Sequence, residues 1–374
     1  MARSYRRFAK IVFVILNILA ALVFLLGCLA PYLHPSKWWL ISLSGLAFAF
    51  AIVTLIAFVF FWLLFRVKYT LISIIPLLIG WKSISMFFGF HMSGKFQHER
   101  PDNVLRVLHW NVARFSEQKK NNNRGSQTRL AMLDQIREQD AGVVCMQEFF
   151  TSNLPDHYDN ITHIMKELGY PYYYYSWDND GYLRWIGQII FSHYPIVGKG
   201  MLRFPAPGIP ESLIYTDILF NNDTVRVFTT HLQSVQFKKQ DYESIESIKN
   251  TDEGMVENSR NIFSKLKRGS ILRARQAEIV KEQVSRSPYP CVLTGDFNDV
   301  PNSYTYFTIK GNELQDAFLA KGLGIGRTYN NIAPTLRIDY ILSSKDFSVR
   351  QFNRIVRDYS DHYMLVADLE LGNR

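Results

Sequence analysis

Long apolar stretches dominate the first 90 residues. Residues 11–30 and 39–65 contain no charged side chain. A helix of about 20 apolar residues crosses roughly 30 Å of hydrocarbon, so each stretch predicts a transmembrane helix. Residues 69–90 are also long enough, but they include a proline, a glycine and Lys82. We predict a third crossing there (about 69–90), with Lys82 near enough to one end for its ammonium group to reach the membrane surface.

The pattern changes after residue 90. Residues 91–103 are polar and predict a linker. Beyond them, short runs of β-branched, aromatic and aliphatic residues are bounded by turn residues, which is typical of strands. Helix-like stretches such as 129–139 and 271–285 lie among them, so residues 104–374 predict an α/β (α+β) domain in which helices cover sheets. The predicted strands cover residues 104–110, 142–146, 188–192, 213–220, 224–230, 291–294, 338–342 and 364–371.

Charge is distributed unevenly along the chain. The first 90 residues contain eight Lys or Arg and no Asp or Glu, whereas the remainder contains 34 basic and 33 acidic residues. Four of the eight precede the first apolar stretch and two separate the second from the third, so the positive-inside rule predicts a cytoplasmic N-terminus. Three crossings place residues 91–374 outside the cytoplasm, and two would leave them inside. We expect an integral protein of a bacterial inner (plasma) membrane with an extracytoplasmic C-terminal domain.

A cleaved leader is the alternative for the first apolar stretch. The sequence LLGC, which ends at Cys28, resembles a bacterial lipoprotein cleavage site. Apolar sequence resumes soon afterwards and two more stretches follow, so we favour an uncleaved helix. Cys145 and Cys291 lie within strand-like runs, where we expect buried, free thiols. The composition excludes a disordered chain and a small disulfide-stapled domain.

Polar side chains follow the ends of several predicted strands. A single residue of this kind is more often a turn former than a catalytic group. Here carboxylates, amides and histidines recur at strand ends, where a sheet presents side chains to a common rim. Oxygen donors without a cysteine–histidine cluster suit a hard cation such as Mg²⁺ or Mn²⁺. The residues are Asn111, Glu148, His231, Asp296, Asn298, Asp339, Asp361 and His362.

The spacing of these residues predicts local geometry. Asp296 and Asn298 are two apart, so in extended chain both side chains point to one face while Phe297 points into the core. Asp361 and His362 are adjacent and cannot share one face of a regular strand. We therefore expect both on a turn just before Tyr363.

Six short motifs occur in a recognisable order: LRVLHWNV, VVCMQE, TTHLQS, TGDFND, RIDYI and SDH. In this order and spacing the chain resembles the endonuclease/exonuclease/phosphatase superfamily over roughly residues 104–371. Deoxyribonuclease I, bacterial sphingomyelinases and apurinic endonucleases are members. The resemblance implies a four-layer α/β/β/α sandwich with two central mixed sheets and an active site at one rim.

The resemblance also implies a metal site. Glu148 corresponds to the principal Mg²⁺ ligand, with Asn111 beside it. Asp361 corresponds to a further ligand or metal-site carboxylate. The expected cofactor is Mg²⁺ or Mn²⁺.

The remaining motif residues correspond to catalytic groups. His362 resembles the general base that activates water, and Asp339 resembles the partner that orients its imidazole. Asp296 and Asn298 resemble residues that position water and phosphoryl oxygens. His231 resembles a second histidine that contacts phosphate in the deoxyribonuclease and sphingomyelinase branches, and apurinic endonucleases differ at that position.

These motifs favour a membrane-anchored, metal-dependent phosphoesterase that hydrolyses a phosphodiester, with a nuclease-like substrate slightly preferred. A lipid-headgroup phosphodiesterase or phosphatase of the sphingomyelinase type stays open, because the nearly neutral C-terminal domain is less suited to duplex binding. The alternative of another class is a non-catalytic membrane binding module on the same fold. Residues 118–126 predict a solvated basic loop, and residues 234–269 form a charged insertion that could be a lid or a membrane-facing arm.

Overall fold

A computed structural model describes residues 2–91, 94–205, 211–235, 237, 240–241 and 255–372. Contacts divide the chain into two compact units. Unit 1 combines Met1–Phe88 with two later segments, Ser234–Arg275 and Asp299–Thr308. Unit 2 comprises Gly89–Gln233, Gln276–Asn298 and Ile309–Arg374.

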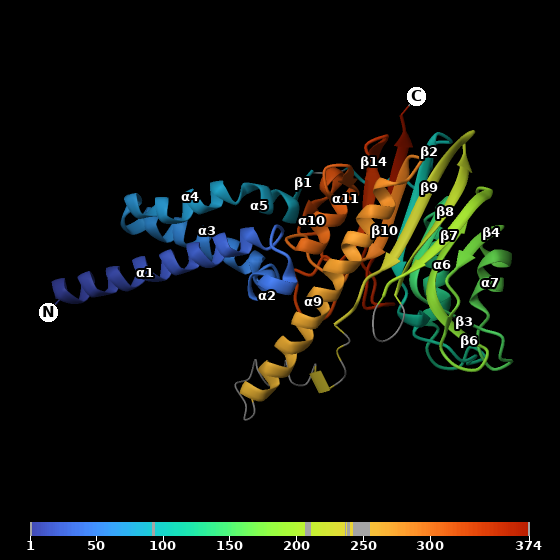
Figure 1. Cartoon of the computed structure of the whole chain (residues 1–374), viewed down its shortest axis with the longest axis horizontal. Helices are drawn as coiled ribbons and strands as arrows, with labels where there is room; N and C mark the ends of the chain where they lie inside the picture. Colours follow the sequence, from blue (N-terminus) through green and yellow to red (C-terminus); the bar gives the residue numbers. More distant parts are fainter. Residues whose placement is uncertain are drawn as a thin grey trace. The chain divides into compact units, whose positions relative to one another are not determined.

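Unit 1 contains apolar helices in each of the three predicted segments (Figure 1), but turn residues at 45–47 interrupt the helix predicted over residues 39–65. Two helices, Tyr5–Leu29 and Phe48–Phe65, are long and apolar enough to cross a membrane. Val67–Ile79 and Trp81–Phe87 pass the same test together, although a 67° bend separates them. The bend lies at Gly80, which follows the helix that contains Pro76, and neither residue favours a continuous helix. The elements are α1 (Ala2–Leu29), α2 (Pro35–Ser44), α3 (Phe48–Phe65), η1 (Val67–Thr70), α4 (Leu71–Ile79) and α5 (Trp81–Phe87).

Side-chain contacts define how these helices run. The rings of Phe13 and Phe61 lie 4.8 Å apart, and those of Phe24 and Phe48 lie 5.1 Å apart, so α3 runs antiparallel to α1. Ser73 of α4 donates a 2.7 Å hydrogen bond to the side chain of Asn17 on α1. This bond is buried, as polar side chains between apolar helices require.

Unit 2 is built on two large mixed sheets. The first has the order β11 (Leu314–Asp316), β13 (Asp339–Ser344), β10 (Cys291–Asp296), β9 (Asp223–His231), β8 (Ser212–Phe220) and β7 (Ile196–Arg203). The second has the order β14 (Phe347–Ile355), β15 (Met364–Leu371), β2 (Val104–Asn111), β3 (Val143–Ser152), β6 (Arg184–Ser192) and β4 (Tyr172–Tyr175), with β5 (Asp178–Asn179) beside β6. A short pair joins β1 (Gly89–Phe90) to β12 (Leu323–Gly324).

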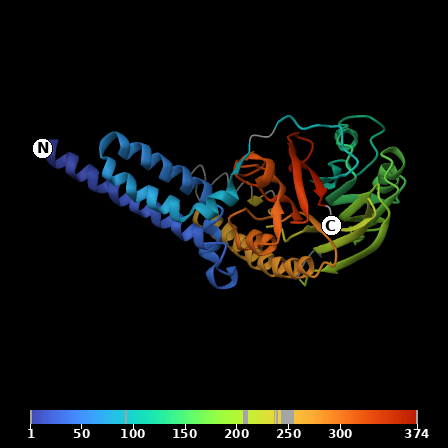
Figure 2. The same cartoon turned by 90° about the horizontal axis from the view of Figure 1, so that it is seen from above.

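The two sheets face one another across the main core. Val107 and Cys145 on one sheet and Val227 and Val292 on the other are fully or almost fully buried in the same apolar cluster. A second cluster packs α6 (Thr128–Glu138) and α7 (Asn160–Glu167) on the outer face of the seven-stranded sheet. The C-terminal part of α9 (Met255–Ser285) covers the six-stranded sheet (Figure 2). Helices α10 (Tyr304–Lys310) and α11 (Ala317–Lys321) follow later in the chain, and Phe318 of α11 belongs to the main core. The predicted four-layer α/β/β/α sandwich is confirmed.

Strand register brings several predicted site residues to one edge. In the six-stranded sheet, Asp296 is paired with His231 on the parallel strand β9 and with Asp339 on the antiparallel strand β13. In the other sheet, Asn111 at the end of β2 is paired with Gln147 of β3. The ends of β9 and β10 and the start of β13 therefore lie together, and cross-sheet hydrogen bonds join them to the end of β2.

Candidate active site

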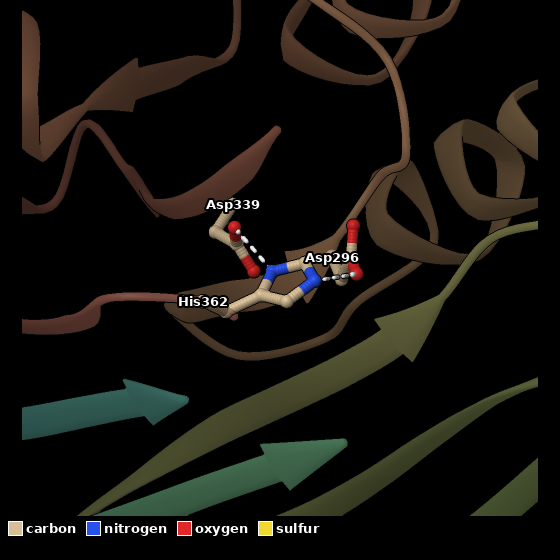
Figure 3. Close-up of side chains that lie close together, drawn as sticks. All are labelled: Asp296, Asp339 and His362. Atoms are coloured by element: carbon tan, nitrogen blue, oxygen red, sulfur yellow. Dashed lines mark hydrogen bonds and ion pairs between the residues drawn. The ribbon is translucent and has the colours of Figure 1, made fainter. Parts of the chain in front are cut away.

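Asp296 occupies the middle of the site, between His231 and His362. Figure 3 shows its carboxylate beside the imidazole of His362. Its Oδ2 atom lies 3.6 Å from Nε2 of His231 and 3.6 Å from Nε2 of His362. Asn111 donates to the same oxygen at 3.1 Å, which joins the two sheets. The carboxylate is only 1% exposed. Burial and the charge of Asp339 raise the pKa of Asp296, while the two histidines oppose that rise.

Asp339 holds the imidazole of His362 in place (Figure 3). Its Oδ2 atom lies 2.9 Å from Nδ1 of His362, and its Oδ1 atom lies 3.1 Å from Nε2 of His109. Burial alone would raise the pKa of Asp339, but the two histidines hold that pKa well below its usual range. Burial lowers the pKa of His362, and the charges of Asp339 and Asp296 outweigh burial and raise it to about 10.

His231 has a carboxylate partner of its own. Its Nδ1 atom lies 3.2 Å from Oε2 of Glu211. Burial lowers the pKa of His231, but the charge and hydrogen bond of Glu211, together with Asp296 and Glu148, raise it to about 10. The site therefore contains two imidazoles, each oriented through Nδ1 by a carboxylate and each directing Nε2 toward Asp296.

Glu148 lies beside Asn111 because the strand is irregular at this point. The pairing of β3 with β6 shifts between Met146 and Phe149, and Glu148 has a φ of 48°. This left-handed conformation is costly for a residue with a Cβ atom, and such strain is concentrated at functional sites. Asn111 donates to Oε1 of Glu148 at 3.5 Å and accepts the backbone N–H of Ala113 at 3.1 Å.

Asp361 and His362 lie on a turn before β15, as the sequence predicts. Burial raises the pKa of Asp361, His362 lowers it, and the negative charge of Glu148 raises it further. Among the residues that the structure describes, no Lys or Arg forms an ion pair with Glu148 or Asp361. Two partly buried carboxylates without a cationic partner in the described part of the chain are oxygen donors that fit a hard divalent cation. Asp296, Asp339 and His362 also have ligand atoms within 4.8 Å of one another, but these three groups already bond among themselves.

Asn298 departs from the predicted extended geometry. Its φ of 51° is left-handed, and its backbone N–H donates to Oδ1 of Asp296 at 2.8 Å. This is an Asx turn, a local bond that Asp offers the backbone and that competes with strand geometry. The side-chain amide of Asn298 donates to the carbonyl of Leu232 at 3.0 Å, next to His231. Phe297 is fully buried, as expected, and packs 4.7 Å from Tyr340.

All eight predicted residues belong to one connected cluster. The sequence analysis missed His109 and Glu211, which contact Asp339 and His231. His109 stands two residues before Asn111, and strand alternation places it on the same face, so its position was available as a signal. Glu211 precedes β8 without any motif around it, so nothing in the sequence singled it out. Cys145 and Cys291 are free and buried, as predicted.

The fold and this cluster define an enzyme that hydrolyses phosphoester bonds. The chain belongs to the Endonuclease/Exonuclease/phosphatase family, whose model matches residues 108–362. Members of this family generally use a divalent metal ion. Residues 9–87 match a second family that is described only as a domain of unknown function. No curated protein matches the chain. Membership confirms the predicted superfamily and the predicted class of enzyme.

Several solved structures are similar to the chain at low sequence identity. An endonuclease/exonuclease/phosphatase from Beutenbergia cavernae is 21% identical, with 72% of each chain covered and a TM-score of 0.50. The human Nocturnin catalytic domain with a bound sulfate anion is 17% identical, covers 73% of this chain and 96% of that chain, and has a TM-score of 0.49. A mannosyl-6-phosphatase from Bacteroides thetaiotaomicron is 19% identical, covers 71% and 99%, and has a TM-score of 0.43.

Proposed function

We propose that the protein is a membrane-anchored, divalent-metal-dependent phosphodiesterase with a nuclease-like reaction. The observation that carries this proposal is the position of Asp296 between two carboxylate-bound histidines. A phosphodiester is negatively charged and repels hydroxide. Two imidazoles and the side-chain amide of Asn111 converge on Asp296, and they offer a bound phosphodiester the donors and the base that hydrolysis requires.

In this mechanism His362 accepts the proton of the attacking water. Its Nδ1–H donates to Asp339, which leaves the lone pair of Nε2 on the side of Asp296. The water oxygen bonds to phosphorus while the bond from phosphorus to the leaving oxygen breaks. His231 is held as a cation by Glu211 and stabilises the charge that develops on the phosphoryl oxygens.

Glu148, Asn111 and Asp361 are the residues that would hold the metal. A bound Mg²⁺ or Mn²⁺ would supply positive charge that offsets the phosphate charge and disfavours protonation of His362. The proximity of Glu148 to Asp361 favours such an ion, because the negative charge of Glu148 disfavours ionisation of Asp361.

Hydrolysis of bis-p-nitrophenyl phosphate by the full-length protein in detergent tests this proposal. We expect turnover with Mg²⁺ or Mn²⁺, none with EDTA, and a loss of about 10²-fold or more in Glu148→Gln and His362→Asn. Glu167→Gln, an exposed carboxylate on α7, is the matched control and should retain activity. Absence of turnover with either metal, together with unchanged ligand binding by both variants, would instead favour a binding module.

A lipid headgroup is the second candidate substrate. Residues 91–374 carry almost equal numbers of basic and acidic side chains, which is unfavourable for salt-dependent duplex binding. A panel of plasmid DNA, RNA, sphingomyelin and phosphoinositide vesicles separates the candidates. Turnover of nucleic acid that weakens steeply with salt favours the nuclease, and turnover of vesicle lipid alone favours the headgroup hydrolase.

We also propose three membrane crossings, with the catalytic domain outside the cytoplasm. The chain leaves α1 and returns antiparallel to it through α3. It then runs parallel to α1, because Ser73 contacts Asn17 and Gly80 lies against Phe24. Residues 67–87 thus follow most of the length of α1. Asn302 in unit 1 donates to the carbonyl of Gly27, at the end of α1 remote from its N-terminal arginines. An alkaline phosphatase fusion at the C-terminus should be active. An inactive phosphatase fusion, together with a fluorescent fusion to green fluorescent protein at the same position, would support two crossings.

A further inference from the structure

The N-terminal part of α9 lies against the loop side of the apolar helices of unit 1. The ammonium group of Lys267 lies 4.9 Å from the ring centre of Trp39. Three residues further along, Ser270 shares a buried 2.9 Å hydrogen bond with Ser42. Trp39 and Ser42 both belong to α2, the short helix that joins the first two candidate membrane spans. These contacts fix the first half of α9 next to that helix.

Helix α2 has the character of an element at the membrane–water interface. Trp38 is 51% exposed and Leu40 is 65% exposed, although the helix directly precedes the apolar α3. Tryptophan is enriched at this depth because its ring is apolar and its N–H is polar. If unit 1 is anchored in a bilayer, as proposed above, α9 begins at the level of the lipid headgroups.

The same half of α9 is strongly basic. Residues 258–277 contain six Lys or Arg and no Asp or Glu. Two of them point inward, where Lys265 pairs with Asp241 and Arg273 pairs with Asp299. The other four define the basic face of α9: Arg260, Lys267, Arg268 and Arg275.

The basic face is continuous and has no carboxylate partner in the described part of the chain. At 100° per residue, its four side chains fall within about 100° of the helix circumference. Arg260, Arg268 and Arg275 are exposed, and Phe263, on the edge of the same face, is 50% exposed. Ile262 and Gly269 are buried on the opposite side of the helix. A helix with cations and an exposed aromatic ring on one side is suited to a membrane surface.

We propose that the basic face of α9 binds the anionic headgroups of the membrane that holds unit 1. Four cations that pair with no carboxylate in the described residues complement a negatively charged lipid surface, and Phe263 can insert its ring at the boundary between headgroups and acyl chains. The interaction is electrostatic, so it depends on anionic lipid and weakens at high salt. The first half of α9 then acts as a membrane-facing arm rather than as a lid.

A fluorescent probe on the full-length protein in nanodiscs tests this proposal. The probe NBD is attached at Ser264→Cys, an exposed position among the four cations, and the wild-type protein with its three native cysteines gives the background. With phosphatidylglycerol present, we expect a blue-shifted emission that doxyl-labelled lipid quenches. With phosphatidylcholine alone, we expect an aqueous probe that iodide quenches.

Charge removal and salt complete the test. R260Q/R268Q/R275Q should abolish the effect of phosphatidylglycerol, whereas the control K119Q/K120Q/R124Q removes equal charge from an exposed loop of unit 2 and should preserve it. If the first variant fails to fold, about 0.5 M NaCl on the unsubstituted arm should reverse the shift. Equal quenching by iodide in both lipids overturns the proposal. A change in probe emission on addition of DNA, with none on addition of anionic lipid, also overturns it.

Discussion

Asp339 offers a sharp test of the two-histidine site, because one substitution removes its charge and keeps its shape. Asp339→Asn retains a side-chain oxygen for one imidazole but replaces the other oxygen with an amide that donates. Since Asp339 accepts from both His362 and His109, one of the two histidines must change tautomer or lose its bond. If His362 turns its lone pair toward position 339, it can no longer accept a proton from water.

The expected loss follows from the role of the base. General acid–base catalysis contributes about 10²–10⁴-fold, so Asp339→Asn should lower kcat by that factor, equivalent to about 3–5 kcal/mol in the barrier. The fold should tolerate the change. Each charge-assisted bond that is lost is worth about 1.5–3 kcal/mol, but removing the charge also relieves the repulsion between Asp339 and Asp296.

The assay combines steady-state hydrolysis of bis-p-nitrophenyl phosphate with thermal unfolding. Asp368→Asn is the matched control, because Asp368 is equally buried and binds Arg106 through two bonds of 2.7 and 2.9 Å on the middle of β15. The control should lose stability and keep kcat. A folded Asp339→Asn enzyme with kcat within about threefold of wild type would refute the assignment of His362 as the base.

Three further outcomes are expected. Glu211→Gln should lower kcat by about 10²-fold, because His231 loses the carboxylate that keeps it cationic, and a normal kcat would remove His231 from the charge-stabilising role. Arg106→Met should lower the free energy of unfolding in denaturant titrations by about 3–5 kcal/mol, because it leaves the Asp368 carboxylate buried without its partner. Burial lowers the pKa of His193 below its ordinary 6.5, so the unfolded chain binds more protons in the window below pH 6.5 and stability should fall as pH drops through it. His193→Gln should flatten that dependence, and an unchanged slope would contradict this explanation.

The sequence predicted the central strands because each is an apolar run bounded by turn residues. It predicted the start of a helix at residue 271, whereas α9 begins at Met255. Gly269 and a highly charged composition concealed the first four turns, since glycine disfavours a helix interior. The glycine lies against other groups: a Cβ atom there would stand 2.9 Å from a guanidinium nitrogen of Arg273. Packing therefore compensates for a poor local propensity.

The strands that the sequence missed share a different cause. Strand β7 has only half-buried and exposed positions, and in β14 buried positions are separated by exposed or half-buried ones, so neither forms an apolar run. Strand β4 consists of four tyrosines, and a run of tyrosines does not by itself distinguish a strand from other packed segments. In each case hydrogen bonds to a neighbouring strand, rather than a local pattern, determine the element.

The position of Glu148 shows why motif recognition succeeded where periodicity would have failed. Along β3, Cys145 faces the core between the sheets and Met146 faces the outer helices. Gln147 continues the alternation: it points inward and donates to Thr229 of the opposite sheet. Strict alternation would then direct Glu148 into the outer apolar layer. The bulge inserts one extra residue, so Phe149 takes the outer position instead and Glu148 turns to the rim beside Asn111. The cost is a left-handed backbone at Glu148, of the order of 1–3 kcal/mol, which only the surrounding sheet can offset. The left-handed backbone of Glu148 is best explained by the active site, because this conformation places the Glu148 carboxylate beside Asn111.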